Sequence, residues 1–266
     1  MVAALCQWLA GVFPCGWFAF PVGAVLAVAW LALLWVVWRE RAGRAWVSAL
    51  LAGPSLFVPM GMLALTCLLL GLTGRPRPDS WWFCAVLLAV LSQLWLVLLR
   101  GWRRRSHRWR FRLIHAGLFV ALGAGFVGSA DAGDWRMAVA VEGETRTGYG
   151  RDGAVTELPH ALRLLEARTE HYANGAPRDF EARLLVDGKE PVSLRVNHPY
   201  ALSWADEVYL VGFEPTFPGH APLCIVAWVH EPWRPLVFVG ILLLVVGSLL
   251  LFLGGPGRQG ERRAGA

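Results

Sequence analysis

One histidine stands inside an apolar stretch that is long enough to cross a membrane. His115 lies in Leu113–Ala130, directly after a block in which seven of the thirteen residues from Arg100 to Arg112 are arginine. An imidazole inside a membrane span is costly, so it marks a functional site by default. A neutral imidazole can coordinate the iron of a haem or hydrogen-bond to a neighbouring helix.

Three interpretations of His115 stay open from the residues alone. It follows Arg112 by three residues, so it can snorkel toward an arginine-lined surface. It can instead pack against another helix through a hydrogen bond, or serve as an axial ligand to a haem held between helices. The same stretch carries Gly117, Ala121 and Gly125 at four-residue spacing, a small-residue face that packs within the chain or docks a partner membrane protein.

Other catalytic or metal-binding motifs are absent from the sequence. It contains no P-loop, no GxSxG, no HExxH, and no CxxC or CxxCH. The five cysteines do not form a disulfide framework: Cys6, Cys15, Cys67 and Cys84 lie in or beside apolar runs. Cys224 is alone in the polar region, where we expect a small buried residue in a strand. We expect His160, His171, His220 and His230 to be solvated, His198 to lie in a turn and His107 to belong to the basic loop.

The charges separate into two regions of opposite sign. Between Asp131 and Arg234 there are 16 acidic and 10 basic residues, a net charge of −6, whereas the rest of the chain has 3 acidic and 15 basic residues, a net charge of +12. The basic excess lies in short loops between apolar runs, where it sets the orientation of a membrane protein. The charge pattern therefore argues against nucleic-acid binding.

The apolar runs predict five transmembrane helices, since about 20 apolar residues cross the hydrocarbon core. The chain is 56% hydrophobic, which excludes an ordinary soluble domain. The predicted spans are Phe18–Trp38, Trp46–Leu72, Trp81–Leu99, Leu113–Ala130 and Pro235–Leu253. Met1–Trp17, which is also apolar, has no positive leading region, so we expect an interfacial or re-entrant segment and no cleaved signal peptide.

The arginine clusters predict which side of the membrane each loop faces. Arg39–Arg44, Arg100–Arg112 and Arg258–Arg263 belong in the cytoplasm by the positive-inside rule, and this places residues 131–234 outside. The predicted division is an N-terminal segment and span at 1–45, a three-helix membrane core at 46–130, an extracytoplasmic β domain at 131–234, a C-terminal helix at 235–254 and a cytoplasmic tail at 255–266.

The region between the last two spans predicts a small, mostly antiparallel β domain. Six or seven short runs alternate or combine apolar and charged residues, which is typical of a sandwich or an open barrel. Asp187-Gly188 separates two of these runs, and that dipeptide favours a tight hairpin turn. Asn197 precedes Pro199 closely, so we expect it to brace a turn.

Taken together, the order of several short motifs resembles the ResB (CcsB) family of system II cytochrome c biogenesis. The residues that carry the resemblance are Asp79-Ser80-Trp81-Trp82-Phe83, Phe111-Arg112-Leu113-Ile114-His115-Ala116-Gly117, Leu158-Pro159, Leu162-Arg163-Leu164, Asp179-Phe180-Glu181-Ala182, Val196-Asn197-His198-Pro199, Val208-Tyr209 and Glu231-Pro232. The chain departs from the family at Ala205, often glycine, at Leu210, often glutamine, in its small outer domain and in its extra N-terminal span. It therefore resembles a short, divergent ResB-like protein.

The resemblance implies a bacterial inner-membrane subunit that handles haem for cytochrome c maturation. His115 matches the family's transmembrane histidine, which implies one axial ligand to haem iron, with the second supplied by a ResC (CcsA)-like partner. Apocytochrome c would be the other partner. The chain lacks the tryptophan-rich motif of ResC, so the resemblance implies a non-catalytic subunit of a haem lyase complex. The alternative hypothesis is a membrane scaffold or sensor with an outer β domain and no cofactor.

Overall fold

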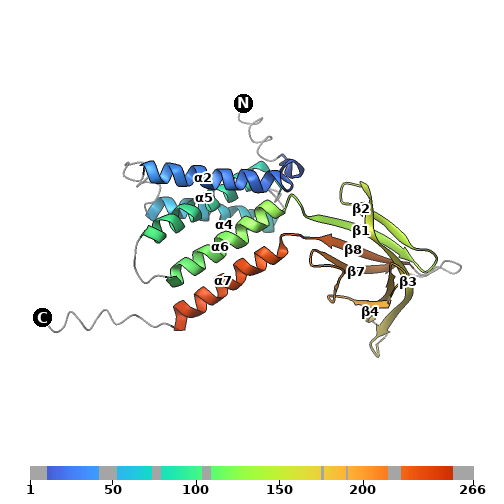
Figure 1. The fold of residues 1–266 in the computed structure, drawn as a ribbon. Helices are drawn as coiled ribbons and strands as arrows, with labels where there is room; N and C mark the ends of the chain where they lie inside the picture. The colour runs from blue at the N-terminus through green and yellow to red at the C-terminus, as the bar shows by residue number, and fades with distance from the viewer. Residues whose placement is uncertain are drawn as a thin grey trace. The chain divides into compact units, whose positions relative to one another are not determined.

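The chain folds into two compact units, which we call the helix unit and the strand unit. The helix unit comprises Met1–Ala130 and Trp233–Ala266, and the strand unit comprises Asp131–Pro232. The computed structural model describes residues 11–41, 53–73, 79–103, 109–174, 177–189, 191–214 and 223–253. Figure 1 shows the two units as a set of helices and a single sheet.

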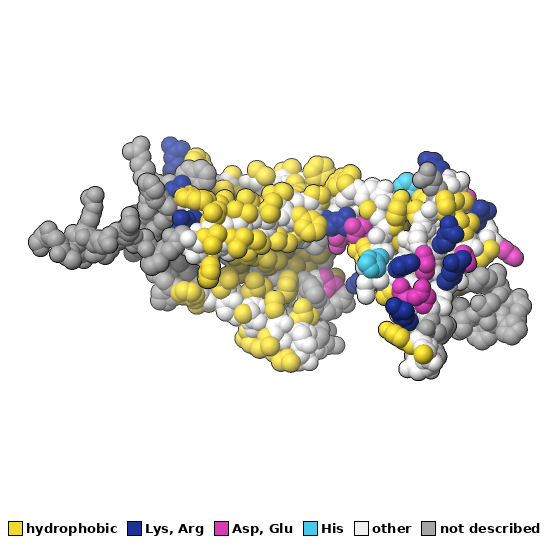
Figure 2. Space-filling model, turned by 90° about the horizontal axis from the view of Figure 1, so that it is seen from below, with side chains coloured by type: hydrophobic (Ala, Val, Ile, Leu, Met, Phe, Trp, Pro, Cys, Tyr) yellow, Lys and Arg dark blue, Asp and Glu magenta, His cyan; other side chains and the backbone are white. Residues whose placement is uncertain are grey.

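The helices of the helix unit are apolar, as in a membrane protein. In chain order the elements are the 3-10 turn η1 (Cys15–Phe18) and the helices α2 (Val22–Arg41), α4 (Gly53–Thr73), α5 (Trp81–Arg103), α6 (Trp109–Gly128) and α7 (Arg234–Leu253). Within the described residues, α2, α5, α6 and α7 are long and apolar enough to cross a bilayer. Figure 2 shows hydrophobic side chains covering the helices, while the charged side chains gather over the strands.

Two predicted helix starts shift in the structure, and a third lies outside the described residues. The first helix begins at Val22 instead of Phe18, because the chain turns through η1 before it. The helix that carries His115 begins at Trp109 instead of Leu113, since arginine is a good helix former and the end of the arginine block continues the helix. The predicted span Trp46–Leu72 is described only from Gly53, where α4 begins, and its first residues lie outside the described range.

Helices α6 and α7 pack so closely that glycines are required between them. A Cβ atom added to Gly117 would lie 2.5 Å from the backbone nitrogen of Leu244, and one added to Gly240 would lie 2.4 Å from the backbone nitrogen of Ala121. Small residues let membrane helices approach backbone to backbone. Two members of the predicted small-residue face, Gly117 and Ala121, thus pack within the chain, whereas Gly125 has no neighbour within 4 Å of its added Cβ.

The strand unit is one antiparallel sheet of eight strands, more than the six or seven predicted. The strands are β1 (Gly133–Ala140), β2 (Thr145–Gly150), β3 (Val155–His171), β4 (Pro177–Val186), β5 (Pro191–Arg195), β6 (Tyr200–Ala201), β7 (Asp206–Glu214) and β8 (Leu223–His230). Their order in the sheet is β5-β4-β3-β2-β1-β8-β7-β6. The extra strand is the two-residue β6, which is too short to show an alternating pattern in the sequence.

The sheet curls around a single apolar core. Its two ends approach each other, because β5 contacts both β6 and β7. Alternate residues point inward, as the period of a strand requires, and the core side chains come from both halves of the sheet: Met137, Val139, Leu158, Leu162, Leu164, Ala182, Leu184, Leu194, Val208, Leu210, Cys224, Val226 and Trp228. The observed architecture is therefore the open-barrel form of the two predicted alternatives.

The turn predicted between β4 and β5 is confirmed. Asp187 and Gly188 both adopt positive φ angles, 48° and 65°, and the backbone N–H of Lys189 donates to the carbonyl of Val186 at 3.0 Å. Positive φ at both central residues is the requirement of a type I′ hairpin turn. Asn197 also lies in the left-handed region, with φ 62°, in the short turn between the bridged residues Arg195 and His198.

Candidate functional site

His115 lies on α6, and one of its two ring nitrogens is hydrogen-bonded to the backbone. Its Nδ1 lies 2.8 Å from the backbone carbonyl oxygen of Phe111, one turn earlier. A carbonyl oxygen only accepts hydrogen bonds, so Nδ1 is the donor and carries a proton. No other residue in the described part of the chain bonds to Nε2. The backbone bond therefore orients the imidazole ring.

An aromatic ring fixes the plane of this imidazole. The ring centroids of Phe111 and His115 are 3.7 Å apart, with a tilt of 32° between the planes. Residues four apart on a helix lie on one face, so this contact follows directly from the sequence spacing. Phe119 continues the same face one turn later and packs on Trp95 of α5 at 5.6 Å between centroids.

The α6–α7 contact turns His115 away from α7. Gly117 faces α7, and two residues correspond to a rotation of about 200° around a helix. The imidazole therefore lies on the side of α6 opposite to the close glycine contact.

An apolar cavity begins one turn beyond His115 on this side of α6. It has a volume of about 620 Å³ and its walls come mainly from α2, α5 and α6. Phe119, Gly123 and Phe126 line it, and they follow His115 by 4, 8 and 11 residues, which is the spacing of one helix face. His115 itself does not line the cavity. A volume of this size is typical of small-molecule and cofactor sites.

Two polar contacts hold α2 at the edge of this cavity. The indole Nε1 of Trp30 donates to Ser92 Oγ at 2.9 Å, and the indole Nε1 of Trp95 donates to the carbonyl of Leu31 at 3.1 Å. Both bonds join α2 to α5. The N-terminal helix, which the resemblance did not require, thus forms one wall of the cavity.

Two histidines of the strand unit are paired with carboxylates, contrary to the prediction that they are solvated. His160 Nδ1 lies 2.6 Å from Asp187 Oδ2, and His230 Nδ1 lies 2.8 Å from Asp206 Oδ1. A signal for both was present in the sequence. On β3, His160 lies two residues from Leu158 and from Leu162, and on β8, His230 lies two residues after Trp228. Residues two apart on a strand share a face, so both histidines belong to the inward face.

Asp206 is the centre of the more extensive of these two networks. Its Oδ1 accepts from Trp228 Nε1 at 3.0 Å as well as from His230, and its Oδ2 accepts from Ser203 Oγ at 2.6 Å. Burial on its own raises the pKa of Asp206, but the three hydrogen bonds outweigh burial and the pKa lies below the usual value. The network ties the start of β7 to the end of β8.

Asp187, in the hairpin turn between β4 and β5, also accepts hydrogen bonds that lower its pKa. The hydrogen bond from His160 is the largest cause of its lowered pKa, followed by the bond from the backbone N–H of Ala161 at 2.8 Å. The His160 ring also stacks on Trp228, with centroids 5.8 Å apart and planes within 19°. These bonds satisfy the carboxylates structurally, and they place no reactive group in a cavity.

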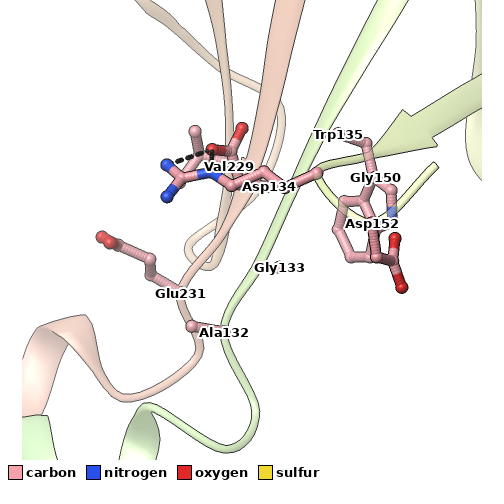
Figure 3. A pocket seen from close by; sticks show the side chains of 9 residues that line it. Ala132, Gly133, Asp134, Trp135, Gly150, Asp152, Val229 and Glu231 are labelled. Carbon is pink, nitrogen blue, oxygen red and sulfur yellow. Dashed lines mark hydrogen bonds and ion pairs between the residues drawn. The ribbon is translucent and has the colours of Figure 1, made fainter. Parts of the chain in front are cut away.

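A second cavity, of about 630 Å³, opens on the strand unit (Figure 3). Its rim holds Asp134, Asp152 and Glu231 beside Trp135. Arg151 donates two hydrogen bonds to Asp134 Oδ2, at 2.9 and 2.6 Å, and Asp152 Oδ1 accepts from the backbone N–H of Ala154. Asp134 and Asp152 thus brace the β2–β3 turn and its contact with β1.

The other histidines and the cysteines named from the sequence are only partly within the described residues. His198 is exposed beside its turn, as predicted, whereas His107 and His220 lie outside the described residues, as does the side chain of His171. Cys224 is fully buried in β8, as predicted, and burial raises the pKa of its thiol to about 12. The four described cysteines, Cys15, Cys67, Cys84 and Cys224, are unbonded, and the described residues contain no group of three or more metal-ligating side chains.

Comparisons with known proteins bear on this arrangement. The comparison with curated proteins found no match. Among solved structures, a chain described as "Cytochrome c Heme Lyase CcmF" is similar at 14% identity with a TM-score of 0.39. The alignment covers 74% of this chain but only 34% of that one, so this chain spans about a third of its length.

The family comparison is the informative one. The model of the ResB-like family matches residues 98–222, a range that contains His115, all of α6 and strands β1 to β7. The motifs near Asp79 and Glu231 lie outside the matched range, and those from Phe111 to Tyr209 lie within it. Over these residues, a little under half of its length, the chain is similar to the ResB-like family.

Proposed function

We propose that this chain is a subunit of a membrane complex that handles haem for cytochrome c maturation, with His115 as one axial ligand of the haem iron. The observation that carries the proposal is the His115 Nδ1–Phe111 hydrogen bond of 2.8 Å, which leaves Nε2 as a free ligand atom inside a membrane helix. Histidines that bind metals usually donate their other N–H to a carbonyl or carboxylate. The similarity of residues 98–222 to the ResB-like family supports the same role.

The residues around His115 fit a haem. A bound haem supplies an iron that accepts an axial imidazole and a flat apolar ring system. In this chain His115 would hold the iron, and Phe111 would keep the imidazole plane fixed through its ring contact. The apolar cavity that begins at Phe119 offers the chain's own low-polarity surface on the same side of α6.

The second axial ligand would come from a partner. His115 is the single histidine among the described residues of the helix unit, so this chain supplies one imidazole there. A ResC (CcsA)-like membrane protein would provide the other, and the chain would act as a non-catalytic subunit of the haem lyase complex. The strand unit, with its acidic surplus, would meet the apocytochrome c.

The proposed orientation follows the arginines. Five transmembrane helices, with Arg39–Arg44, Arg100–Arg112 and Arg258–Arg263 on the cytoplasmic side of a bacterial inner membrane, place residues 131–234 outside. In that orientation His115 lies toward the cytoplasmic end of α6, where haem would enter, and the cavity lies toward the outer end.

The test is the visible spectrum of the purified chain, alone and co-expressed with its ResC-like partner. We expect the Soret band of wild-type protein to fall by more than about tenfold in His115→Ala, since an axial ligand is lost, and to return in part when imidazole is added. His198→Ala, at an exposed histidine of the strand unit, is the matched control and should keep the wild-type spectrum.

The opposite result has a clear meaning. If folded wild-type chain with its partner present binds no haem, or if His115→Ala binds haem with an unchanged Soret maximum, then His115 is not an axial ligand. A colourless complex would favour the scaffold or sensor function.

A further inference from the structure

Small residues from two helices leave the space that forms the apolar cavity of the helix unit. Ala24 and Ala27 of α2 line the cavity, and so do Gly123 and Ala124 of α6. Leu91 of α5 also lines it, and a Cβ atom added to Gly123 would lie 3.9 Å from Leu91 Cδ2. Side chains that end at Cβ or lack it cannot fill the space between α2 and α6, so the cavity stays open.

The lining of this cavity is apolar and carries no charge. No charged side chain lines it among the residues that the structure describes. Ser92 accepts from Trp30 and donates from its Oγ to the carbonyl of Leu88 at 2.7 Å, and Ser129 Oγ donates to the carbonyl of Phe126 at 2.7 Å. A polar group placed here would lose its hydration without gaining a charged partner, which costs free energy. The part of a ligand that enters this cavity is therefore a hydrocarbon.

The cavity opens sideways, toward the surroundings of the helices. Leu26 and Val28 line it although their side chains are 48% and 66% exposed. The exposed apolar side chains of a membrane-spanning helix contact lipid tails, which are as apolar as leucine. A lipid tail can therefore enter the cavity from the bilayer without crossing water.

The length of the cavity matches the depth of one leaflet. Its lining runs from Gly23 to Leu31 on α2 and from Phe119 to Val127 on α6. Each of these stretches spans about 12 Å, at a rise of about 1.5 Å per residue. The hydrocarbon core of a bilayer is about 30 Å thick, so one leaflet provides about 15 Å of lipid tail. Trp233 lines the cavity as well, and tryptophan is enriched at the level of the lipid headgroups.

We propose that this cavity binds one acyl chain of a membrane phospholipid, whose headgroup stays outside at the level of Trp233. The bound chain fills the space between α2 and α6 and supports α2 against the rest of the helix unit. In the proposed orientation, on which this point alone rests, the lipid comes from the outer leaflet. The inference goes beyond haem handling, because His115 does not line the cavity and the lining offers no cation to the two propionates of a haem.

The experiment labels the cavity from within. The full chain is reconstituted into phosphatidylcholine nanodiscs in which some lipids carry a diazirine on one acyl chain, irradiated, digested and mapped by mass spectrometry. Leu91 is the informative position, because it lines the cavity but is only 7% exposed. Leu242, 63% exposed on α7, reports ordinary contact with the bilayer. We expect label at both positions in the wild-type chain.

Matched variants on one helix test whether the label at Leu91 depends on the cavity. Gly123→Leu adds a side chain to the lining, so label at Leu91 should fall by more than about fivefold while label at Leu242 stays unchanged. Gly125→Leu should behave as wild type, because Gly125 does not line the cavity and its added Cβ has no neighbour within 4 Å.

A second pair of variants repeats the comparison on α2, in case Gly123→Leu does not fold. Ala27→Leu, which also fills the cavity, should lower the label at Leu91, and Ala29→Leu, at an exposed residue outside the lining, should not. Absence of label at Leu91 in the wild-type chain would overturn the proposal. So would equal label at Leu91 in the filled variants and their controls.

The outcome is separable from the haem-handling proposal. Lipid is read as label at Leu91 and haem as a Soret band, so His115→Ala should keep the label and Gly123→Leu should keep the band. If haemin abolishes the label at Leu91 in the wild-type chain but not in His115→Ala, the cavity belongs to haem. That result would overturn the lipid proposal and leave the haem proposal standing.

Discussion

The two units of this protein hide their apolar side chains in different ways. In the strand unit Met137, Leu164 and Trp228 are at most 1% exposed, so the sheet closes its own core. In the helix unit large side chains such as Phe252, 87% exposed, and Leu242, 63% exposed, face outward and need a bilayer to cover them. One unit is held together by burial from water, whereas the other relies on close contact between helix backbones.

The histidines of the two units also differ, in the charge of their hydrogen-bond partners. His160 and His230 each meet a carboxylate, which brings a full negative charge to the imidazole. The hydrogen-bond partner of His115 is a backbone carbonyl, which orients the ring without adding charge. The residue proposed as a haem ligand is therefore the histidine that has no carboxylate partner.

The largest effect that tests this comparison is expected at Trp228. Replacing it with alanine should destabilise the strand unit by about 3–5 kcal/mol, because a fully buried indole is lost and a cavity remains. Hydrogen exchange of the full chain in detergent should show faster exchange in β7 and β8 with α6 and α7 unchanged. Trp204→Ala, at a tryptophan that is 67% exposed, is the control. Equal loss of protection in the helices would mean that the two units unfold as one.

A smaller effect is expected at the α6–α7 contact. Gly117→Val should destabilise the helix unit by about 1–3 kcal/mol, because the new side chain meets the backbone of α7. Gly125→Val is matched to it on the same helix, and its site has open space. Thermal unfolding monitored by the accessibility of Cys67 to a maleimide should separate the two variants. Similar midpoints for both would show that backbone contact does not hold this unit together.

The smallest effect is a pH dependence confined to the strand unit. Asp206 and Asp187 have lowered pKa values when folded, so their contribution to stability is present above the unfolded value of about 3.9 and is lost as pH falls through the folded pKa. Asp206→Asn should cost about 1 kcal/mol at neutral pH, the worth of one hydrogen bond, and should flatten the acid limb of the stability curve. Glu142→Gln, in the β1–β2 turn, is the control.

The pH dependence is tested by comparing the two units. Hydrogen exchange in β7 and β8 should change more between pH 3 and pH 7, after correction for intrinsic exchange rates, than hydrogen exchange in α6 and α7. If Asp206→Asn keeps the full acid limb of wild type, the Asp206 network does not couple proton binding to folding.

Local patterns in the sequence were enough to predict much of the fold. The helices α5, α6 and α7 follow from uninterrupted apolar runs, and the β4–β5 turn follows from Asp187-Gly188, because these signals involve residues that are neighbours in the chain. The Phe111–His115 contact also belongs to this class, since the two residues are one helical turn apart.

Features that depend on distant residues were not predicted. The carboxylate partners of His160 and His230 lie 27 and 24 positions away. No periodicity reports such pairs, because they depend on which strands and segments meet in the fold. The two-residue strand β6 was missed for a simpler reason, its length.

The pairing of β1 with β8 has a consequence for how this protein can be altered. The first and last strands of the strand unit are direct neighbours, with Gly133 opposite His230, so the chain enters and leaves the unit at points about 5 Å apart. Excising the whole unit therefore leaves a gap that a few residues can close, at little cost in loop-closure entropy. The helical hairpin of α6 and α7 can accept the strand unit as a removable insert, and a different domain whose two termini lie equally close could be grafted in its place.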